Sequence, residues 1–216
     1  MHHLQRAGGV AAVVEGATYI VGFGVMLGYL APRGFIDAQG DPAASLTFLL
    51  ENQVALYLWC LLIYLVAGGA LVVLSLGIHD RLKNGSPALA QVSTAFGLIW
   101  SGLVLASGMV ALVGQRAAVG LAADNRTEAV SSWSSTSVVQ DALGGGIEMV
   151  GALWILLLSI AAVRTRLLPR GLAVLGIIIG VAGVSTLVPQ AEAAAPVFGL
   201  GFIAWYLWAG RILMRG

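Results

Sequence analysis

Six long apolar stretches constrain this chain more than any other feature. They extend over residues 8–30, 54–78, 88–114, 142–163, 171–188 and 195–213. A helix of about 20 residues crosses a hydrocarbon core of about 30 Å, and it satisfies its own backbone polar groups there. The composition agrees, since only 10% of the residues are charged, against about 25% in soluble domains. We therefore predict an all-α polytopic membrane protein, a single domain over residues 1–216 with six transmembrane helices.

The basic residues predict how this domain is oriented. If the helices alternate across the membrane, the side of the N-terminus holds Arg6, Arg81, Lys83, Arg164, Arg166, Arg170, Arg211 and Arg215. The other side holds Arg33, Arg116 and Arg126. Basic residues that flank short loops stay in the cytoplasm, so we expect both termini to be cytoplasmic.

A helix-start signal precedes the second stretch. Asp41 followed by Pro42 is typical of an N-cap and a first-turn proline. A helix from Pro42 to Ile78 would be about 55 Å long, too long for one crossing. We expect a bend near Glu51 and Asn52.

The segment before the fourth stretch holds another such signal. Asn125, followed three residues later by Glu128, resembles a capping box. Val130, Trp133 and Val138 then predict a short interfacial helix on the outer face, with Trp133 as an anchor at the membrane surface.

Two glutamates inside the apolar stretches are the strongest indication of function. Glu15 and Glu148 each lie about seven or eight residues into a stretch, roughly 10 Å from its nearer end. A charged carboxylate at the centre of a span costs about 2.5–3.5 kcal/mol on insertion scales, so such groups face the bundle interior, pair, or stay protonated. Helical spacing places them on small and polar stripes, which are Gly8, Ala12, Glu15, Tyr19 and Gly22 in the first helix and Asp141, Gly144, Glu148, Ala152 and Ser159 in the fourth.

These stripes predict a polar cavity suited to proton carriage or cation binding. Asp141 would lie at its outer mouth, Glu148 deeper and Glu15 nearer the cytoplasm. The alternative is structural, with each carboxyl hydrogen-bonded to a neighbouring hydroxyl or carbonyl to fix the helix register.

Further candidates surround these acids. Tyr19 and Trp154 are expected to line the cavity, and Gln140 adjoins Asp141. The glycines at 144–146 would let a backbone or a ligand approach Glu148 closely.

Two small-x-x-x-small pairs, Gly24 with Gly28 and Gly176 with Gly180, favour close helix packing. The helices would pack within one bundle, or else at a dimer face. A three-plus-three inverted repeat, with Phe96–Leu98 matching Phe198–Leu200, is a further hypothesis.

Several chemistries are missing from the sequence. Lys83 is the only lysine, so no span holds a retinal Schiff base, and the histidines are too few for a bis-histidine haem bundle. Motifs for zinc, di-iron or nucleoside phosphates do not occur. The net charge of +1 gives no sign of nucleic-acid binding. We expect no metal, no cofactor and no nucleic-acid partner, and an enzyme would have to work through carboxylates alone.

Short motifs carry a family resemblance. The segments Gly40-Asp41-Pro42-Ala43-Ala44, Val139 to Glu148 and Val197-Phe198-Gly199-Leu200 resemble bacterial membrane proteins grouped as domain of unknown function 4386. The resemblance implies a six-helix, multi-pass protein of the bacterial inner membrane, and it implies no reaction or ligand.

Three functional hypotheses follow. The first is a bundle in the lipid bilayer that binds or translocates a small or lipophilic cargo, with Glu148 and Glu15 as protonatable groups. The second is a non-catalytic accessory subunit, present as a homo-oligomer or within a larger membrane complex. The third is a carboxylate-dependent membrane enzyme.

Overall fold

Long helices account for nearly all of the chain in the computed structural model, which describes residues 2–144, 148–188, 190 and 194–215. In chain order they are α1 (His2–Val25), α2 (Pro42–Glu51), α3 (Gln53–Cys60), α4 (Ala67–Leu82), α5 (Pro87–Ala122), α6 (Arg126–Gly144), α7 (Met149–Thr165), α8 (Arg170–Ser185) and α9 (Ala195–Arg215). Two π-helical turns, Met26–Leu30 and Leu61–Val66, continue α1 and join α3 to α4. The described residues therefore form an all-helical fold, as predicted.

Within the described part of the chain, five candidate spans are long and apolar enough to cross a membrane. They are His3–Arg33, Gln53–Leu82, Pro87–Ala122, Arg126–Thr165, which comprises α6 and α7, and Pro196–Arg215. Helix α8 is apolar but has only 16 residues. Large apolar side chains lie exposed on the outside of the bundle, where lipid would cover them, among them Val10, Ile20, Val92, Ile99, Ile178, Val181 and Leu200. The chain is a polytopic membrane protein.

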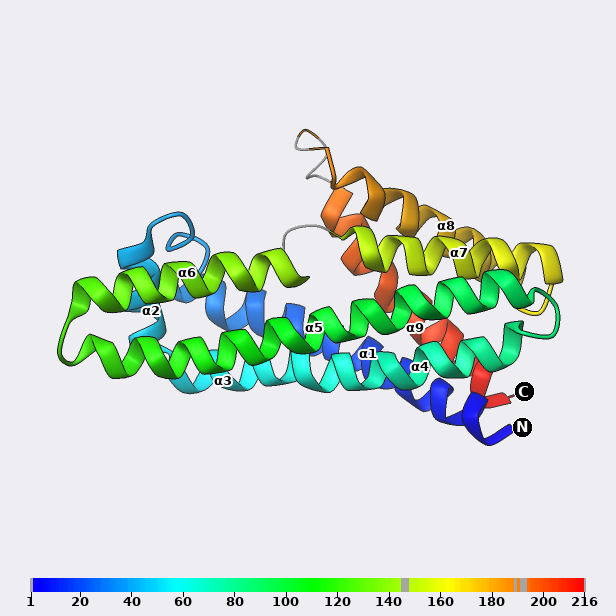
Figure 1. The fold of residues 1–216 in the computed structure, drawn as a ribbon, viewed down its shortest axis with the longest axis horizontal. Coiled ribbons are helices and arrows are strands. Elements are labelled where there is room, and N and C mark those ends of the chain that lie inside the picture. Colours follow the sequence, from blue (N-terminus) through cyan, green and yellow to red (C-terminus); the bar gives the residue numbers. More distant parts are fainter. Residues whose placement is uncertain (1, 145–147, 189, 191–193, 216) are drawn as a thin grey trace.

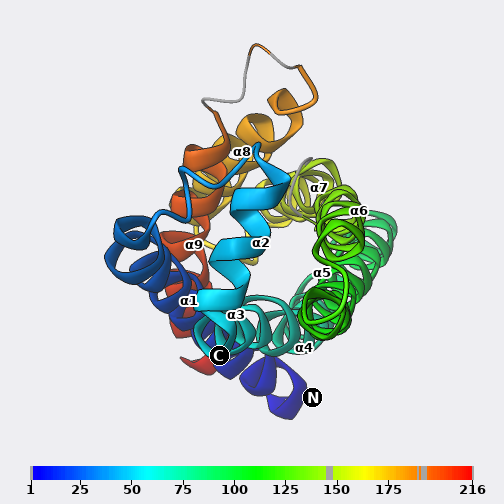
Figure 2. The same cartoon turned by 90° about the vertical axis from the view of Figure 1, so that its left-hand side faces the viewer.

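The helices form an elongated ring. Both termini lie at one end, together with the α4–α5 and α7–α8 connections, and α2 and the α5–α6 connection lie at the other (Figure 1). Viewed from that second end, the long helices stand around a centre and α2 lies across the front (Figure 2). We call the first end the terminus end and the second the α2 end.

The local signals around α2 are confirmed. Asp41 accepts hydrogen bonds from the backbone N–H groups of Ala43 and Ala44, which makes it the N-cap. The helix is interrupted at Asn52, at the predicted bend. Asn125 caps α6 as expected, since its Oδ1 accepts from the backbone N–H of Glu128, but the Glu128 carboxylate accepts from the side-chain Nδ2 of Asn125 rather than from its backbone N–H.

The predicted fourth and third stretches need correction. The stretch 142–163 is divided between two helices, because α6 ends at Gly144 and α7 begins at Met149. Helix α6 is no short interfacial segment, since its 19 residues pack along α5, which extends to Ala122 rather than ending near Gly114. Trp133 is no surface anchor either. It is 8% exposed and donates a hydrogen bond to Ser45 Oγ over 2.9 Å, because α2 covers it.

Separate apolar cores stabilise the two ends. The larger core lies between α1, α4, α5, α7, α8 and α9. It contains aromatic rings that pack against one another, among them Trp100, Trp154, Phe202 and Trp205. The core of the α2 end includes Leu46, Phe48, Leu49 and Trp133.

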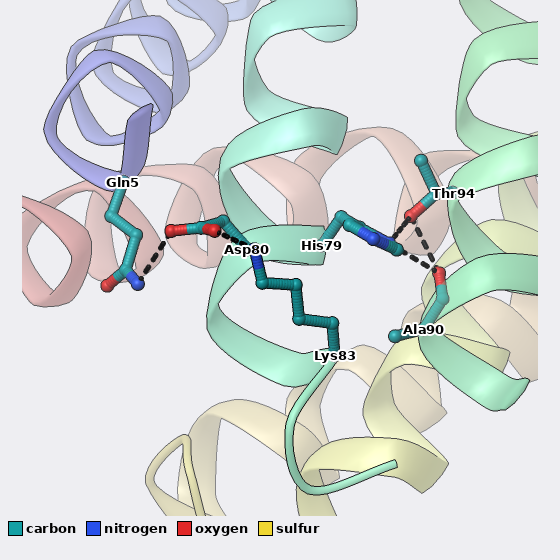
Figure 3. A network of polar contacts seen from close by, with 6 residues as sticks. All are labelled: Gln5, His79, Asp80, Lys83, Ala90 and Thr94. Atoms are coloured by element: carbon teal, nitrogen blue, oxygen red, sulfur yellow. Dashed lines mark hydrogen bonds and ion pairs between the residues drawn. The ribbon is translucent and has the colours of Figure 1, made fainter. Parts of the chain in front are cut away.

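Polar contacts link neighbouring helices at the terminus end (Figure 3). Asp80 of α4 accepts hydrogen bonds from Gln5 Nε2 of α1 over 3.1 Å and from Lys83 Nζ. His79 Nδ1 lies 3.0 Å from Thr94 Oγ1 and 3.3 Å from the carbonyl oxygen of Ala90, linking α4 to α5.

Candidate functional site

A cavity inside the ring brings the two glutamates together. Its volume is about 190 Å³. Glu15 comes from the middle of α1, and Glu148 from the residue that precedes α7. The other lining residues come from α1, the π-helical turns and helices α3, α4, α5, α6 and α9, and they are Thr18, Tyr19, Gly22, Phe23, Met26, Trp59, Ile63, Tyr64, Ala67, Leu71, Trp100, Val104, Gly144 and Tyr206. We call this the carboxyl cavity.

Glu15 is buried, and its Oε1 has no hydrogen-bond partner among the described residues. Its side chain is 2% exposed. The nearby hydroxyl of Thr18 does not help, because it donates to the backbone carbonyl of Glu15 over 2.8 Å. The hydroxyl of Ser101 donates to the carbonyl of Gly68 instead. The structural alternative was that the Glu15 carboxyl fixes the helix register through hydrogen bonds. The described residues form no such hydrogen bond with its Oε1.

Glu148 lies at a helix end rather than inside a helix. It is the N-cap residue of α7, and its backbone N–H lies 3.3 Å from Thr186 Oγ1. The free N–H groups of a first helical turn favour a negative charge nearby. The predicted stripe from Asp141 to Ser159 on one helix is therefore wrong. Its Gly144 lines the carboxyl cavity, while Gly145 and Gly146 lie outside the described residues.

Tyrosine rings cover the wall of the cavity beside Glu15. Tyr19 and Tyr206 meet edge to face with ring centroids 5.5 Å apart. Tyr206 is fully buried, and its hydroxyl, like Oε1 of Glu15, has no hydrogen-bond partner among the residues described. Buried polar atoms are nearly always satisfied in native proteins. Two unsatisfied groups on one cavity point to a space that holds water or a ligand.

Asp141 and Gln140 lie apart from the two glutamates. They line a second cavity of about 470 Å³ under α2, which we call the α2 cavity. Asp141 itself is exposed. Gln140 donates from Nε2 to the hydroxyl of Tyr64 over 3.1 Å, and Tyr64 lines the carboxyl cavity. We expected one cavity with Asp141 at its mouth. The structure has two cavities instead, and the hydrogen-bonded residues Tyr64 and Gln140 each line one of them.

Trp154 does not line either cavity. It is 1% exposed and stacks on Phe202 with ring centroids 6.1 Å apart, behind Trp100. Its role is to hold Trp100, which does line the carboxyl cavity.

Trp59 is a residue that sequence reasoning missed. It lines both cavities, and its Nε1 donates to the carbonyl of Gly22 on α1 over 3.0 Å. Its ring also meets Phe35 edge to face at 5.8 Å. The sequence offered no signal for this position, because aromatic residues near the ends of spans are typical membrane-surface anchors.

Comparison with known proteins supplies a family and no activity. No curated protein and no solved structure matches the chain. A family model does match, over residues 14–216, and these include every residue that lines the two cavities. The chain belongs to that family, which is described as Domain of unknown function (DUF4386).

Proposed function

We propose that this protein binds a small or lipophilic cargo in the carboxyl cavity and moves it across the bacterial inner membrane, with Glu15 and Glu148 as protonatable groups. The observation that carries the proposal is their convergence. Two acids that are far apart in the sequence line one largely apolar cavity, and Oε1 of Glu15 is buried with no hydrogen-bond partner among the described residues. Ionisable groups within transmembrane bundles commonly mark substrate or proton pathways.

The arrangement of the two cavities supports a route. The carboxyl cavity and the α2 cavity share Trp59 as a wall. The hydrogen bond between Tyr64 and Gln140 joins residues of the two cavities beside it. We infer that cargo enters from the α2 end and that these side chains separate the outer compartment from the inner one.

The membrane position follows from length and charge. Helix α8, at about 24 Å, is short for a core of about 30 Å but is apolar enough to cross where the bilayer thins or where flanking residues extend it. With α8 as a crossing, six spans place both termini on one side of the membrane, which agrees with their common end in Figure 1. The basic residues of that end, such as Arg81, Arg164 and Arg170, favour the cytoplasm.

Native mass spectrometry tests the proposal. The protein would be released from its own membranes in mild detergent, as wild type, Glu148→Gln and Asp124→Asn. We expect a small bound mass on wild type that Glu148→Gln loses, because the carboxyl lines the occupied cavity. Asp124→Asn is the matched control, since it removes an exposed acid that lines neither cavity.

Two results would contradict the proposal. One is a small mass that all three proteins retain equally, which would place the ligand elsewhere. The other is a heavier hetero-assembly, without a small mass, that survives Glu148→Gln. That second result would favour the accessory subunit, and the partner's identity would then supply the function.

A further inference from the structure

We propose that the cargo of the carboxyl cavity is a small organic cation, an amine or quaternary ammonium with an apolar body. This inference rests on the proposed function and names its substrate class. The carboxylates of Glu15 and Glu148 would face the positive head, and the aromatic rings of the wall would cover the rest. Three independent properties of the lining carry it, namely its charge, its rings and its size.

The charge of the lining has one sign. Glu15 and Glu148 line the cavity, and among the described lining residues there is no lysine, arginine or histidine. Glu15 Oε1 also lacks a hydrogen-bond partner within the part of the chain that is described. A buried carboxylate without a countercharge is strongly unfavourable, so the site fits a ligand that brings the positive charge with it. An anionic cargo would meet repulsion from both acids.

The rings of the lining suit an organic cation better than a metal ion. Tyr19, Phe23, Trp59, Tyr64, Trp100 and Tyr206 all line the cavity. The face of an aromatic ring attracts an ammonium group by about 0.5–2 kcal/mol, and aromatic cages recognise quaternary ammonium ligands in this way. Calcium and magnesium instead need about six or more oxygen ligands.

Packing behind the rings holds two of them in place. Trp59 is fixed by its hydrogen bond to the carbonyl of Gly22. Trp100 lies against α7, where a Cβ added at Gly151 would come within 2.6 Å of its indole ring. Trp154 packs on the same ring at a centroid distance of 5.6 Å. A wall that is already ordered loses little entropy when a ligand binds, which favours affinity for a small molecule.

The size of the cavity limits the cargo. Its volume of about 190 Å³ is slightly larger than that of the engineered protein cavities of about 150 Å³ that bind benzene. A single ring with an ammonium head, or an amine of similar bulk, therefore fits the space. Larger lipids and multi-ring compounds do not fit without rearrangement.

Equilibrium dialysis with a matched ligand pair tests the cation class. The protein in lipid nanodiscs would be dialysed against benzyltrimethylammonium and against neopentylbenzene, which has carbon in place of the charged nitrogen. Empty nanodiscs give the correction for partition into lipid. We expect the cation to bind wild type at least about tenfold more tightly than its neutral isostere, and Glu15→Gln to remove about that factor. Binding of the isostere to Glu15→Gln should be unchanged, and Asp124→Asn, at an exposed acid that lines neither cavity, should behave as wild type.

The outcomes separate this inference from the proposed function. If neopentylbenzene binds wild type as tightly as the cation, the cation class is wrong and a small-molecule cavity remains. If neither compound binds and native mass spectrometry finds no small mass, both the inference and the proposed function fail. Should Glu15→Gln lose both ligands through misfolding, Glu148→Gln provides the same comparison, and an unchanged preference for the cation there overturns the role of the carboxyls.

Discussion

Asp80 and Glu15 are both buried acids near the axis of one bundle, yet their surroundings differ. Asp80 is 7% exposed and accepts hydrogen bonds from Gln5 and Lys83 (Figure 3). Glu15 is 2% exposed, lines a cavity, and has an oxygen without a partner among the described residues. A buried acid whose hydrogen bonds are made stabilises a fold. A buried acid without partners reduces the stability of the protein, and on a cavity it becomes favourable only when a ligand binds to it. Asp80 therefore belongs to the structural terminus end of the bundle, and Glu15 belongs to the candidate functional site.

The closest helix contact at the terminus end gives the largest expected effect. A Cβ added at Gly77 of α4 would lie 2.7 Å from the Cα of Gly8 in α1 and 3.1 Å from the carbonyl oxygen of Leu4. Neither backbone atom can move without separating the helices. We expect Gly77→Ala to lower the free energy of unfolding by about 1–3 kcal/mol, which thermal denaturation in detergent would measure.

The control for that change is Gly24→Ala. Nothing lies within 4 Å of a Cβ added at Gly24, so alanine should stabilise the helix by up to about 1 kcal/mol. The two small-x-x-x-small pairs differ in the same way, because Gly180 packs against Leu156 of α7 while Gly24 and Gly28 have no such neighbour. Equal stability of the Gly77 and Gly24 variants would show that the α1–α4 contact is looser than described.

The second prediction compares the two acids directly. Asp80→Asn removes the charge that pairs with Lys83, whose side chain is 37% exposed. Because solvent screens such a pair, we expect the free energy of unfolding to fall by only about 1 kcal/mol. Glu15→Gln should leave that free energy unchanged or raise it slightly, since it replaces an unsatisfied acid by a neutral amide. If Glu15→Gln were the more destabilising change in denaturation measurements, Glu15 would have a structural role.

Local sequence signals predicted local structure well. The N-cap at Asp41, the bend at Asn52 and the cap at Asn125 each depend on a few adjacent residues, and each is present. The same holds for the apolar stretches, because burial in lipid leaves few alternatives to a helix.

Tertiary packing explains what the sequence could not predict. Helix α6 is polar and serine-rich, and it is a long packed helix only because its Ala129 and Trp133 lie under α2 and beside α5. The end of α6 at Gly144 and the start of α7 at Met149 could not be predicted, because the small residues of this region carry no helical periodicity that would show where one helix ends. The common cavity of Glu15 and Glu148 was expected, but its separation from Asp141 depends on Trp59 and Tyr64, which come from another part of the chain.

The last comparison concerns two buried hydroxyls. Ser101 Oγ donates to the carbonyl of Gly68 over 2.6 Å, whereas the hydroxyl of Tyr206 has no partner within the described part of the chain. Ser101→Ala should therefore lower the free energy of unfolding by about 1 kcal/mol. Tyr206→Phe keeps the ring stacked on Phe202 at 4.8 Å and removes only the unsatisfied group, so the protein should be equally stable or slightly more stable. A clear loss of stability in Tyr206→Phe, measured in parallel, would mean that a water or ligand satisfies this hydroxyl in the resting protein, and the carboxyl cavity would then be occupied before any cargo is added.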